Sequence, residues 1–391
     1  MRIVGRLVLA GCTCLLLMLA SVWLEHRRPV TLPPPTGLFA VGRRTFEWRD
    51  AKDPRRDLLV WVWYPTDLPS ADREYLPPST REAVTRYRGS INSRFLTHDL
   101  AKVRSHAQKN APISARRPSY PVLLMRGGAS AEVWNYSTLA EDLASHGYVV
   151  AGIDAPGRTL TVAFPDGRVR VRQPENNPER CLDVAVAEQN QCMSSLLETW
   201  TGDMKFVVER LSDPNDPDVA GSFGNRLNIE RLGVFGHSFG GAQAAQFCRE
   251  DPRCKAGIDI DGALFGSVVQ DGLTCPFLFL MGGHSGESGP EATRVLSDIE
   301  SVYARLPLES RMRIEIRGAN HFLFSDDSAL LKSRILMGGL RMAGLLKIDG
   351  RRQLAITAAC VRAFFDVYLQ GANAAALKDL PRRYPEIRIG E

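Results

Sequence analysis

Residues 232–241 constrain the fold of this chain more than any other stretch. They read Leu-Gly-Val-Phe-Gly-His-Ser-Phe-Gly-Gly, a short apolar strand that ends in a Gly-x-Ser-x-Gly turn, and a helix-forming run follows at 242–247. This strand–turn–helix pattern is typical of a nucleophile elbow, in which a strained turn lifts the serine hydroxyl out of the sheet. Gly236 and Gly240 lack a Cβ, so the strand and the helix can approach each other closely. The pattern predicts a catalytic serine at Ser238; the alternative is an ordinary glycine-rich turn.

The rest of the chain alternates between apolar strand patterns and amphipathic helix patterns. This alternation predicts an α/β fold with a mainly parallel sheet and helices on both faces. The predicted strands lie at 58–64, 121–125, 148–153, 231–235, 256–260, 276–281 and 311–317, with a hairpin at 162–171. The predicted helices lie at about 79–110, 137–146, 199–211, 291–305 and 353–370.

The length of 391 residues suits one domain of about 300 residues with accessory segments. We expect an N-terminal membrane anchor or signal segment at 1–28, a proline-rich extended tether at 29–45, the catalytic domain at 46–375 and a C-terminal tail at 376–391. Three excursions, at about 79–118, 155–198 and 324–352, are expected to lie over or beside the carboxyl ends of the strands like a cap.

The formal charge of +5 is partly local, because four arginines and one glutamate in residues 1–28 supply three of those charges. No basic tract interleaved with aromatic residues is present, which argues against a nucleic-acid partner. No Cys-x-x-Cys motif or Cys/His cluster indicates a metal site, and we expect no cofactor.

Residues 7–24 form an uncharged apolar run that is just long enough to span a bilayer and also fits a secretory signal. No convincing Ala-x-Ala site follows it, which favours an uncleaved anchor. The residues before Cys12 resemble a bacterial lipobox, but the apolar run continues well past that cysteine. Both interpretations place the body outside the cytoplasm. The expected contact with the membrane is through this segment.

The body holds six cysteines, and two pairs of them are close in sequence. The pairs Cys181/Cys192 and Cys248/Cys254 suit disulfide bonds in an oxidising compartment. Cys275 and Cys360 remain, and buried free thiols are the alternative interpretation for the whole set.

A serine nucleophile needs a base, and the base needs a carboxylate that orients it. After a nucleophile elbow these partners follow in the order acid, then histidine, at the carboxyl ends of later strands. His321 follows the predicted strand 311–317 and is the expected base, against a surface loop histidine; His284 lies where the acid more often stands.

Three carboxylates are candidates for the acid that orients the histidine. Asp261 ends the strand that follows the elbow helix, whereas Glu287 follows the next strand, the commoner position. Asp259 lies on the same face as Asp261 but further inside the sheet. The alternative for Asp261 is an Asp-Gly turn.

An oxyanion hole needs two backbone N–H groups. Phe239, directly after the serine, is expected to supply one. The other is expected from the loop after residues 121–125, from Gly128, with Gly127 or Ala129 also possible; the alternative is a merely flexible glycine loop.

With these residues together, the chain resembles the α/β-hydrolases of the platelet-activating factor acetylhydrolase type, including dienelactone-hydrolase-like bacterial esterases. The resemblance covers about residues 40–375 and rests on the segments 60–65, 143–150, 236–241, 260–262 and 318–322. It implies Asp261 as the acid and calcium-independent serine ester hydrolysis, often of short acyl chains on phospholipids. Two features depart from the family: Arg126 stands where a His-Gly opening is usual, and the bulky Trp and Pro after the acid are missing.

The expected function is therefore hydrolysis of lipid or short-chain acyl esters through an acyl-enzyme. The apolar excursion 324–352 could line an acyl pocket, rest on a membrane surface or simply pack on the core. The alternatives are a cutinase-like polyester hydrolase, which predicts Glu287 or another later acid, and a catalytically silent membrane-anchored binding protein.

Overall fold

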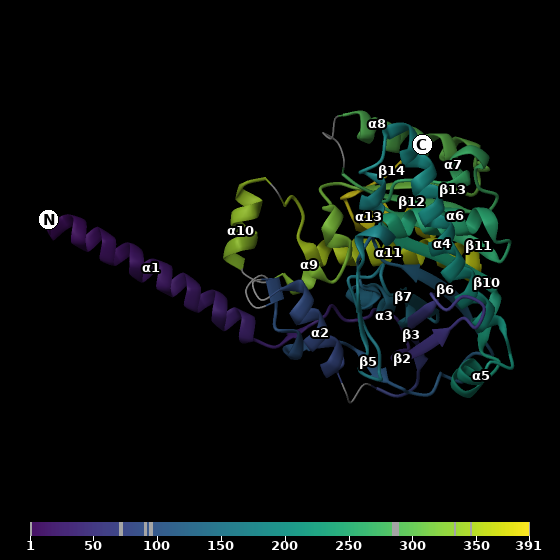
Figure 1. The fold of residues 1–391 in the computed structure, drawn as a ribbon, viewed down its shortest axis with the longest axis horizontal. Helices are drawn as coiled ribbons and strands as arrows, with labels where there is room; N and C mark the ends of the chain where they lie inside the picture. Colours follow the sequence, from purple (N-terminus) through teal and green to yellow (C-terminus); the bar gives the residue numbers. More distant parts are fainter. Residues whose placement is uncertain are drawn as a thin grey trace.

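The computed structural model describes residues 2–69, 73–89, 92–93, 97–283, 289–331, 334–344 and 346–390. Its centre is a ten-stranded sheet (Figure 1). In spatial order the strands are β14 (Ile387–Ile389), β13 (Arg311–Ile316), β12 (Phe277–Gly282), β11 (Cys254–Ile260), β10 (Leu227–His237), β6 (Tyr120–Arg126), β7 (Val149–Asp154), β3 (Asp57–Thr66), β2 (Ala40–Arg49) and β5 (Ala107–Lys109).

The six strands from β13 to β7 are all parallel to their neighbours. Antiparallel pairing is confined to the flanks, between β13 and β14, β7 and β3, and β3 and β2. The mainly parallel sheet is thus confirmed, and each strand predicted from the sequence is present. Strands β2, β5 and β14 were not predicted.

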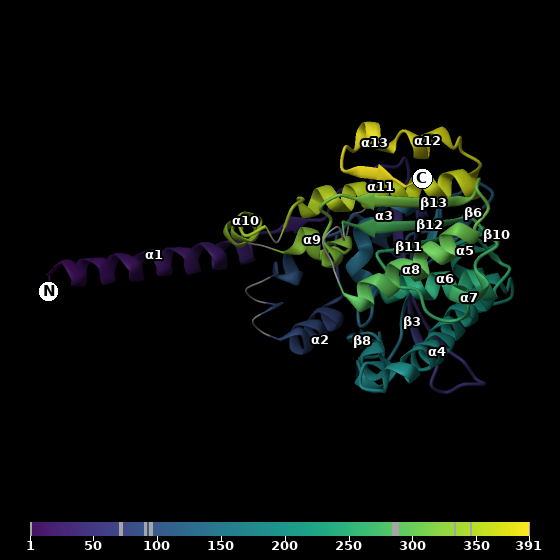
Figure 2. The same cartoon turned by 90° about the horizontal axis from the view of Figure 1, so that it is seen from above.

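Helices cover both faces of this sheet (Figure 2). One face carries α3 (Ser137–Ser145) and α11 (Gly350–Gln370). The other face carries α4 (Val186–Ser212), α5 (Pro217–Phe223), α6 (Phe239–Glu250), α7 (Ser267–Asp271) and α8 (Pro290–Arg305). Successive strand residues point to opposite faces, and in β6 Leu123 packs toward the first group of helices whereas Leu124 packs toward the second.

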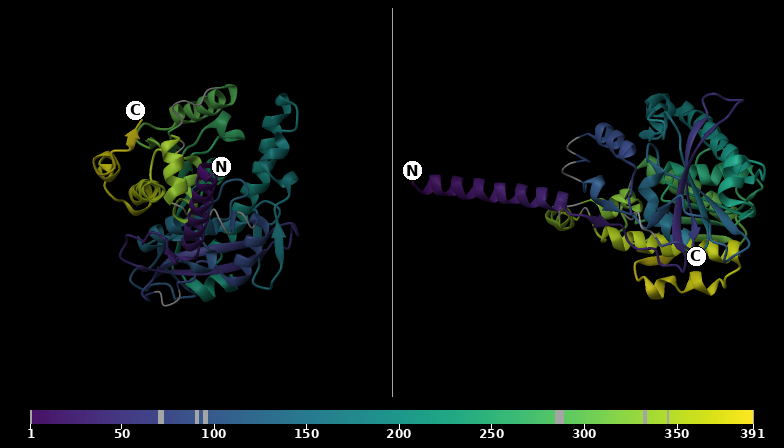
Figure 3. Two further views of the ribbon diagram at one scale, coloured as in Figure 1. Left: turned by 90° about the vertical axis from the view of Figure 1, so that its left-hand side faces the viewer. Right: turned by 90° about the horizontal axis from the view of Figure 1, so that it is seen from below.

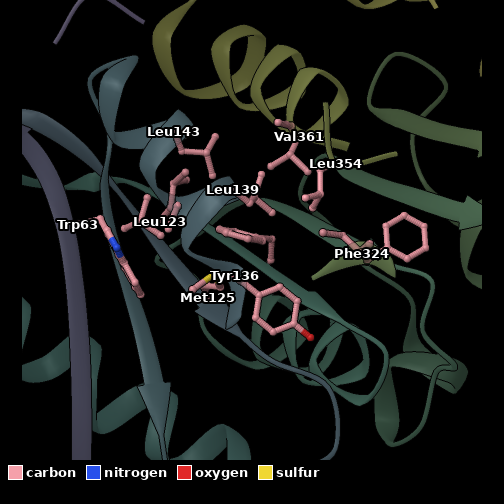
Figure 4. Close-up of a cluster of buried hydrophobic side chains, with 14 of the residues drawn as sticks. Trp63, Leu123, Met125, Tyr136, Leu139, Leu143, Phe324, Leu354 and Val361 are labelled. Carbon is pink, nitrogen blue, oxygen red and sulfur yellow. The ribbon is translucent and has the colours of Figure 1, made fainter. Parts of the chain in front are cut away.

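The core between the sheet and the α3–α11 face is shown in Figure 4. Leu139 and Leu143 of α3 meet Leu354 and Val361 of α11 over Leu123, and all five side chains are at most 3% exposed. Burying a side chain of this size contributes about 1.5–3 kcal/mol to folding. This packing fixes α11 beneath the loop that carries His321.

The first excursion was predicted to be helical over about 79–110, and this prediction is wrong beyond residue 88. Helix α2 (Pro78–Arg88) ends before Gly89, and the chain later forms a short 3-10 helix, Leu100–Lys102, and the strand β4 (Val103–Arg104). Gly89 has φ +82°, a conformation that residues with a Cβ rarely adopt, so the helix stops there.

The second excursion contains the predicted hairpin, formed by β8 (Thr161–Ala163) and β9 (Val169–Val171) around Gly167. Two 3-10 helices, Pro174–Asn176 and Pro178–Cys181, follow it. Helix α4 begins at Val186, earlier than the predicted 199, so much of the excursion is an extension of a core helix.

The third excursion begins with the 3-10 helix His321–Phe324 and continues as α9 (Asp327–Leu330) and α10 (Arg334–Met342). Leu331 forms a β-bridge with Thr97 of the first excursion, and α2 contacts β8 of the second. The three excursions therefore lie together at one end of the sheet (Figures 1 and 2).

The N-terminal helix α1 (Arg2–Arg27) projects from the body (Figures 1 and 3). Its segment Val4–Arg27 is long and apolar enough to cross a membrane. The helix is attached at its base, since His26 Nδ1 lies 3.1 Å from the carbonyl oxygen of Thr97 and Lys102 donates to the carbonyl of Arg27 over 2.7 Å.

The proline-rich segment after α1 is extended and packs on the body. Strand β1 (Val30–Thr31) pairs with β4, Leu32 is buried, and the Gly37 N–H donates to Ser145 Oγ. The C-terminal residues form α12 (Ala375–Lys378), α13 (Leu380–Arg383) and then β14 at the sheet edge.

Both predicted disulfide bonds are present, Cys181–Cys192 and Cys248–Cys254, and Cys275 and Cys360 are free thiols. The Sγ of Cys275 lies 4.0 Å from that of Cys254. Because two of the three sulfurs gathered there share a covalent bond, the group does not offer a set of thiolate ligands.

Candidate active site

Ser238 stands at the sharp turn between β10 and α6. Its backbone has φ 55° and ψ −125°, a strained conformation for a residue with a side chain. A Cβ on Gly236 would lie 2.1 Å from the carbonyl oxygen of Gly240, and one on Gly240 would lie 2.5 Å from that of Arg126. Only glycine fits at both positions, so the sequence motif sets the turn that presents the half-buried Ser238 hydroxyl.

The structure brings His321 and Asp261 to this hydroxyl from two other strand ends. His321 Nε2 lies 3.1 Å from Ser238 Oγ, and His321 Nδ1 lies 2.8 Å from Asp261 Oδ2. The Asp261 carboxylate can only accept, so Nδ1 carries the proton and the Nε2 lone pair faces the serine. This arrangement can remove a proton from the hydroxyl.

Asp261 follows β11, where its carboxyl group is held from a second side. The Gly282 N–H, at the end of β12, donates to Asp261 Oδ1 over 2.6 Å. The Asp261 side chain is completely buried, whereas about a third of the His321 side chain is exposed. The base is therefore open to a substrate while its partner is shielded from water.

The loop that carries His321 is fixed by Gln353, a residue that no sequence pattern indicates. Buried Gln353 of α11 accepts from the Asn320 N–H and donates to the Asn320 carbonyl. The Asn320 side chain in turn accepts from the Phe322 N–H and begins the short helix. No local motif indicates Gln353, because its role depends on a contact between distant segments.

The opposite side of Ser238 is formed by Phe239 and the loop after β6. Phe239 begins α6, so its N–H lies at a helix N-terminus. Gly128 lies directly against the nucleophile, since a Cβ there would be 3.2 Å from Ser238 Cβ, whereas Gly127 faces Ala131 and Tyr136. Of the two glycines predicted for this role, Gly128 is the one beside the serine.

Two further polar side chains meet this loop. The Gly128 N–H donates to the Tyr136 hydroxyl over 3.3 Å, and Tyr136 Oη lies 2.8 Å from His237 Nδ1. Burial, and then the nearby charge of His321, lower the pKa of His237 to about 3, so its ring is neutral. His237 lies within the sequence motif, but Tyr136, at the end of the 3-10 helix Val133–Tyr136, carries no sequence signal.

The remaining candidates are not at the site or are not described. Asp259 is completely buried behind the elbow, and burial and the neighbouring Asp261 raise its pKa to about 8. His284 and Glu287 lie outside the described residues. Arg126 points away from Ser238, because its guanidinium donates to the Ile153 carbonyl and to Gln243 Oε1 and is completely enclosed.

Comparison with known proteins assigns the chain to a family. Residues 25–165 and 168–374 match the family described as platelet-activating factor acetylhydrolase, isoform II. The chain belongs to this family. The resemblance inferred from the elbow and the strand ends is therefore confirmed.

Relatives in this family and beyond it carry esterase names. A probable 1-alkyl-2-acetylglycerophosphocholine esterase of Arthroderma benhamiae is 25% identical, over 91% of this chain and 92% of that protein. The platelet-activating factor acetylhydrolase of Cavia porcellus is 26% identical, over 90% and 83% of the two chains. A solved structure, the ferulic acid esterase from Streptomyces cinnamoneus, superposes with a TM-score of 0.74 at 26% identity, covering 93% of this chain and all of its own.

These findings confirm two of the predictions. The chain has the α/β-hydrolase fold, and it is a carboxylic ester hydrolase.

Proposed function

We propose that this member of the acetylhydrolase family is a serine esterase in which Ser238 is the nucleophile, His321 the general base and Asp261 the residue that orients the base. The observation that carries the proposal is the continuous hydrogen-bonded relay, 3.1 Å from serine to histidine and 2.8 Å from histidine to aspartate. Packing of the fold does not require three polar side chains from separate strand ends to meet in the order serine, histidine, aspartate, so catalysis is the better explanation.

The reaction would proceed in two acyl transfers. Ser238 Oγ attacks the ester carbonyl while His321 Nε2 takes its proton, and the N–H of Phe239, with an N–H of the neighbouring loop 127–129, stabilises the oxyanion. His321 then returns the proton to the leaving alcohol. Water, deprotonated by the same imidazole, releases the acid and restores the serine.

The substrate we propose is an ester with a short acyl group and a lipid-like alcohol. Two relatives are named for acetyl esters, which supports a short acyl group. Aromatic side chains border the site: Phe239 packs on Trp200 and on Phe265, and the ring of Phe322, 74% exposed, meets the edge of His321. An exposed apolar ring beside the base suits an apolar substrate.

We also propose that α1 anchors the enzyme to a membrane, with the body on the extracytoplasmic side. The described part of Val4–Arg27 lies outside the protein core, as a helix in lipid would. Both disulfides suit an oxidising compartment. Membrane fractionation, together with the mass of the mature protein, would decide between a retained anchor and a removed signal.

Labelling with a fluorophosphonate probe and hydrolysis of p-nitrophenyl esters test the catalytic proposal. Wild type is expected to label and to hydrolyse the acetyl ester, whereas Ser238→Ala should not label and should lose about 10⁴-fold or more in kcat. Ser212→Ala, a serine at the far end of α4, is the matched control and should behave as wild type. Labelling of Ser238→Ala would contradict the assignment of the nucleophile.

The substrate proposal is tested by extending the acyl chain from acetyl to octanoyl. We expect kcat/KM to fall by about tenfold or more along the series, since a short acyl pocket excludes added methylenes. Equal or higher activity on octanoyl esters, or on an insoluble polyester, would contradict a short-acyl esterase while leaving the serine mechanism in place.

A further inference from the structure

We propose that the guanidinium of Arg126 supplies a buried positive charge that stabilises the oxyanion at Ser238 from behind the loop 127–129. This inference rests on the proposed function and names a further residue for the same reaction. Arg126 does not touch the substrate. Its charge acts across the backbone that binds the oxyanion.

Arg126 lies on the side of the nucleophile that carries the oxyanion loop. Ser238 directly follows β10, and Asp261 and His321 reach it from the side of the sheet that holds β11 and β13. Arg126 ends β6, on the other side of β10, and donates to the Ile153 carbonyl of β7 over 2.6 Å. A charge placed there favours the oxyanion more than it opposes protonation of the histidine.

Two contacts join this charge to the backbone of the oxyanion site. Arg126 Nε donates to Gln243 Oε1 over 2.6 Å, and Gln243 Nε2 donates to the Phe239 carbonyl over 3.1 Å. A Cβ on Gly240 would lie 2.5 Å from the carbonyl oxygens of both Arg126 and Gly127, so the end of β6 contacts the first turn of α6 directly. The guanidinium is therefore one glutamine side chain away from the residue whose N–H follows the nucleophile.

The Arg126 charge is buried without a carboxylate partner. The side chain is 3% exposed, its two acceptors are uncharged, and it forms no ion pair with a described residue. Burial lowers its pKa to about 10, so it remains charged at neutral pH. A charge buried in this way is costly for folding. A negative charge that appears only during the reaction would give that cost a function.

The titratable side chains that act on Arg126 do not cancel its charge. They are Arg158, Asp203 and Asp154. Arg158 forms an ion pair with Asp203, which also accepts from Arg56 over 3.1 Å. Burial raises the pKa of Asp154 to about 8, so at pH 7 most of its carboxyl groups are protonated. The group as a whole keeps a net positive charge.

Trp200 of α4 helps to keep water away from this charge. The guanidinium carbon of Arg126 lies 5.2 Å from the indole centroid, and the indole meets the Phe239 ring edge-on at 5.1 Å. The gap that Trp200 and Arg126 share with Gly127 and Gly128 has no room for a water molecule. Without water to screen it, a charge acts over a longer distance. Its fixed position also means that nothing has to reorganise when the oxyanion forms.

The test measures kcat and KM for p-nitrophenyl acetate in Arg126→Met, which keeps much of the side-chain volume and removes the charge. We expect kcat to fall about 10- to 100-fold with KM within about twofold, because the oxyanion exists only after the serine has attacked. Inhibition by a trifluoromethyl ketone, whose adduct with Ser238 carries an oxyanion, should weaken by a similar factor. A purely structural role would leave the inhibitor affinity unchanged.

Arg126→Lys separates the charge from the shape of the side chain. At pH 7 it should keep kcat within about fivefold of wild type, since the ammonium supplies the same charge. Its kcat should then fall between about pH 7 and 9, because burial lowers the pKa of an ammonium and the neutral amine stabilises no oxyanion. Equal losses in the lysine and methionine variants at every pH from 6 to 9 would overturn the inference.

A double variant keeps the test informative if Arg126→Met folds poorly. Arg126→Met/Gln243→Leu removes both partners of the side-chain hydrogen bond, so no glutamine oxygen is left buried without a donor. Its thermal stability should be closer to wild type than that of Arg126→Met, whereas kcat should remain about 10- to 100-fold low. Recovery of kcat to within twofold of wild type would show that packing, and not charge, was lost.

Arg43→Met is the matched control. Arg43 of β2 is 5% exposed, donates to the Tyr75 carbonyl over 2.6 Å and lies 5.4 Å from the ring centroid of Trp61. It is thus a buried guanidinium over an indole, near the opposite edge of the sheet. Its loss should lower thermal stability while kcat stays within about twofold. An equal loss of kcat in Arg43→Met and Arg126→Met would contradict a specific role for Arg126.

Two outcomes separate the two proposals. If wild type neither turns over nor labels, the proposed function itself is wrong, and the role of Arg126 falls with it. If wild type is active and Arg126→Met keeps both kcat and the inhibitor affinity within twofold, the serine mechanism stands and the buried charge does not stabilise the oxyanion.

Discussion

One aspartate lies inside strand β11 and another directly follows its end, and the two side chains have opposite surroundings. Asp261, just past the strand, accepts from the Gly282 N–H and from His321. Asp259, two residues earlier, lies behind the elbow; its carboxyl oxygens make no hydrogen bond of normal geometry to a described residue, and burial raises its pKa to about 8. A shift of two residues therefore separates an orienting carboxylate past the strand end from a neutral, packed acid inside the strand.

The comparison also bears on the choice that the sequence left open. Strand alternation predicts the same face for both aspartates, so periodicity could not separate them. Only the strand end is within reach of a histidine on a neighbouring loop. Depth in the sheet, which the positions of the two residues in the strand pattern already indicated, decides between them.

The largest expected effect is the difference in activity between two identical substitutions. Asp261→Asn should lower kcat by about 10³- to 10⁴-fold, because the amide cannot hold His321 in the tautomer that accepts the serine proton. Asp259→Asn should change kcat by less than about threefold, since a neutral carboxyl is replaced by a neutral amide of the same shape. Steady-state hydrolysis of an acetyl ester measures both.

The result that breaks the comparison is a reversal of the two effects. If Asp259→Asn lost as much activity as Asp261→Asn at unchanged thermal stability, the buried acid would belong to the catalytic machinery. If Asp261→Asn stayed active, another carboxylate would have to orient His321, and Glu287 would again become a candidate.

The parts of the site that the sequence predicted are those with local causes. The elbow depends on glycines within four residues of each other, and Ser238 follows from them. His321 follows from the order in which the strands end, whereas Asp261 was preferred over Glu287 through the family resemblance. Each of these is a property of one short segment.

The parts that were missed depend on contacts between distant segments. Gln353 reaches the His321 loop from α11, and Tyr136 reaches His237 across about a hundred residues. Strand β2 was missed because Arg43 and Arg44 interrupt its apolar pattern, although Arg43 is buried and donates to the Tyr75 carbonyl. In each case a polar side chain finds its partner only in the folded chain.

The second prediction concerns pH and stability. The pKa of Asp259 is about 8 in the folded protein and near 3.8 as an isolated side chain. Between these values the folded state holds a proton that the unfolded state releases, so this group's contribution to stability falls as pH rises from about 4 to about 8, by up to about 1.4 kcal/mol per pH unit. Asp259→Asn has no such proton, and its stability relative to wild type should rise over that range.

Chemical denaturation of wild type and Asp259→Asn at pH 5, 6, 7 and 8 measures this difference. Asp183→Asn, at an exposed carboxyl, is the control and should give a curve parallel to wild type. Parallel curves for Asp259→Asn as well would mean that the buried acid is charged in the folded protein, and the contrast with Asp261 would disappear.

The smallest expected effect concerns the space around Asp259. A Cβ on Gly241 would lie 1.7 Å from Asp259 Oδ1, so helix α6 approaches β11 through a gap that only glycine leaves open. Gly241→Ala should destabilise the fold by about 1–3 kcal/mol through overpacking. Because Asp259→Ala removes the clashing carboxyl, the double variant Gly241→Ala/Asp259→Ala should recover part of that loss, and thermal unfolding of the four proteins measures the coupling. Additive losses would show that the strain of Gly241→Ala lies elsewhere in the elbow, and that Asp259 is not packed directly beneath the turn that presents Ser238.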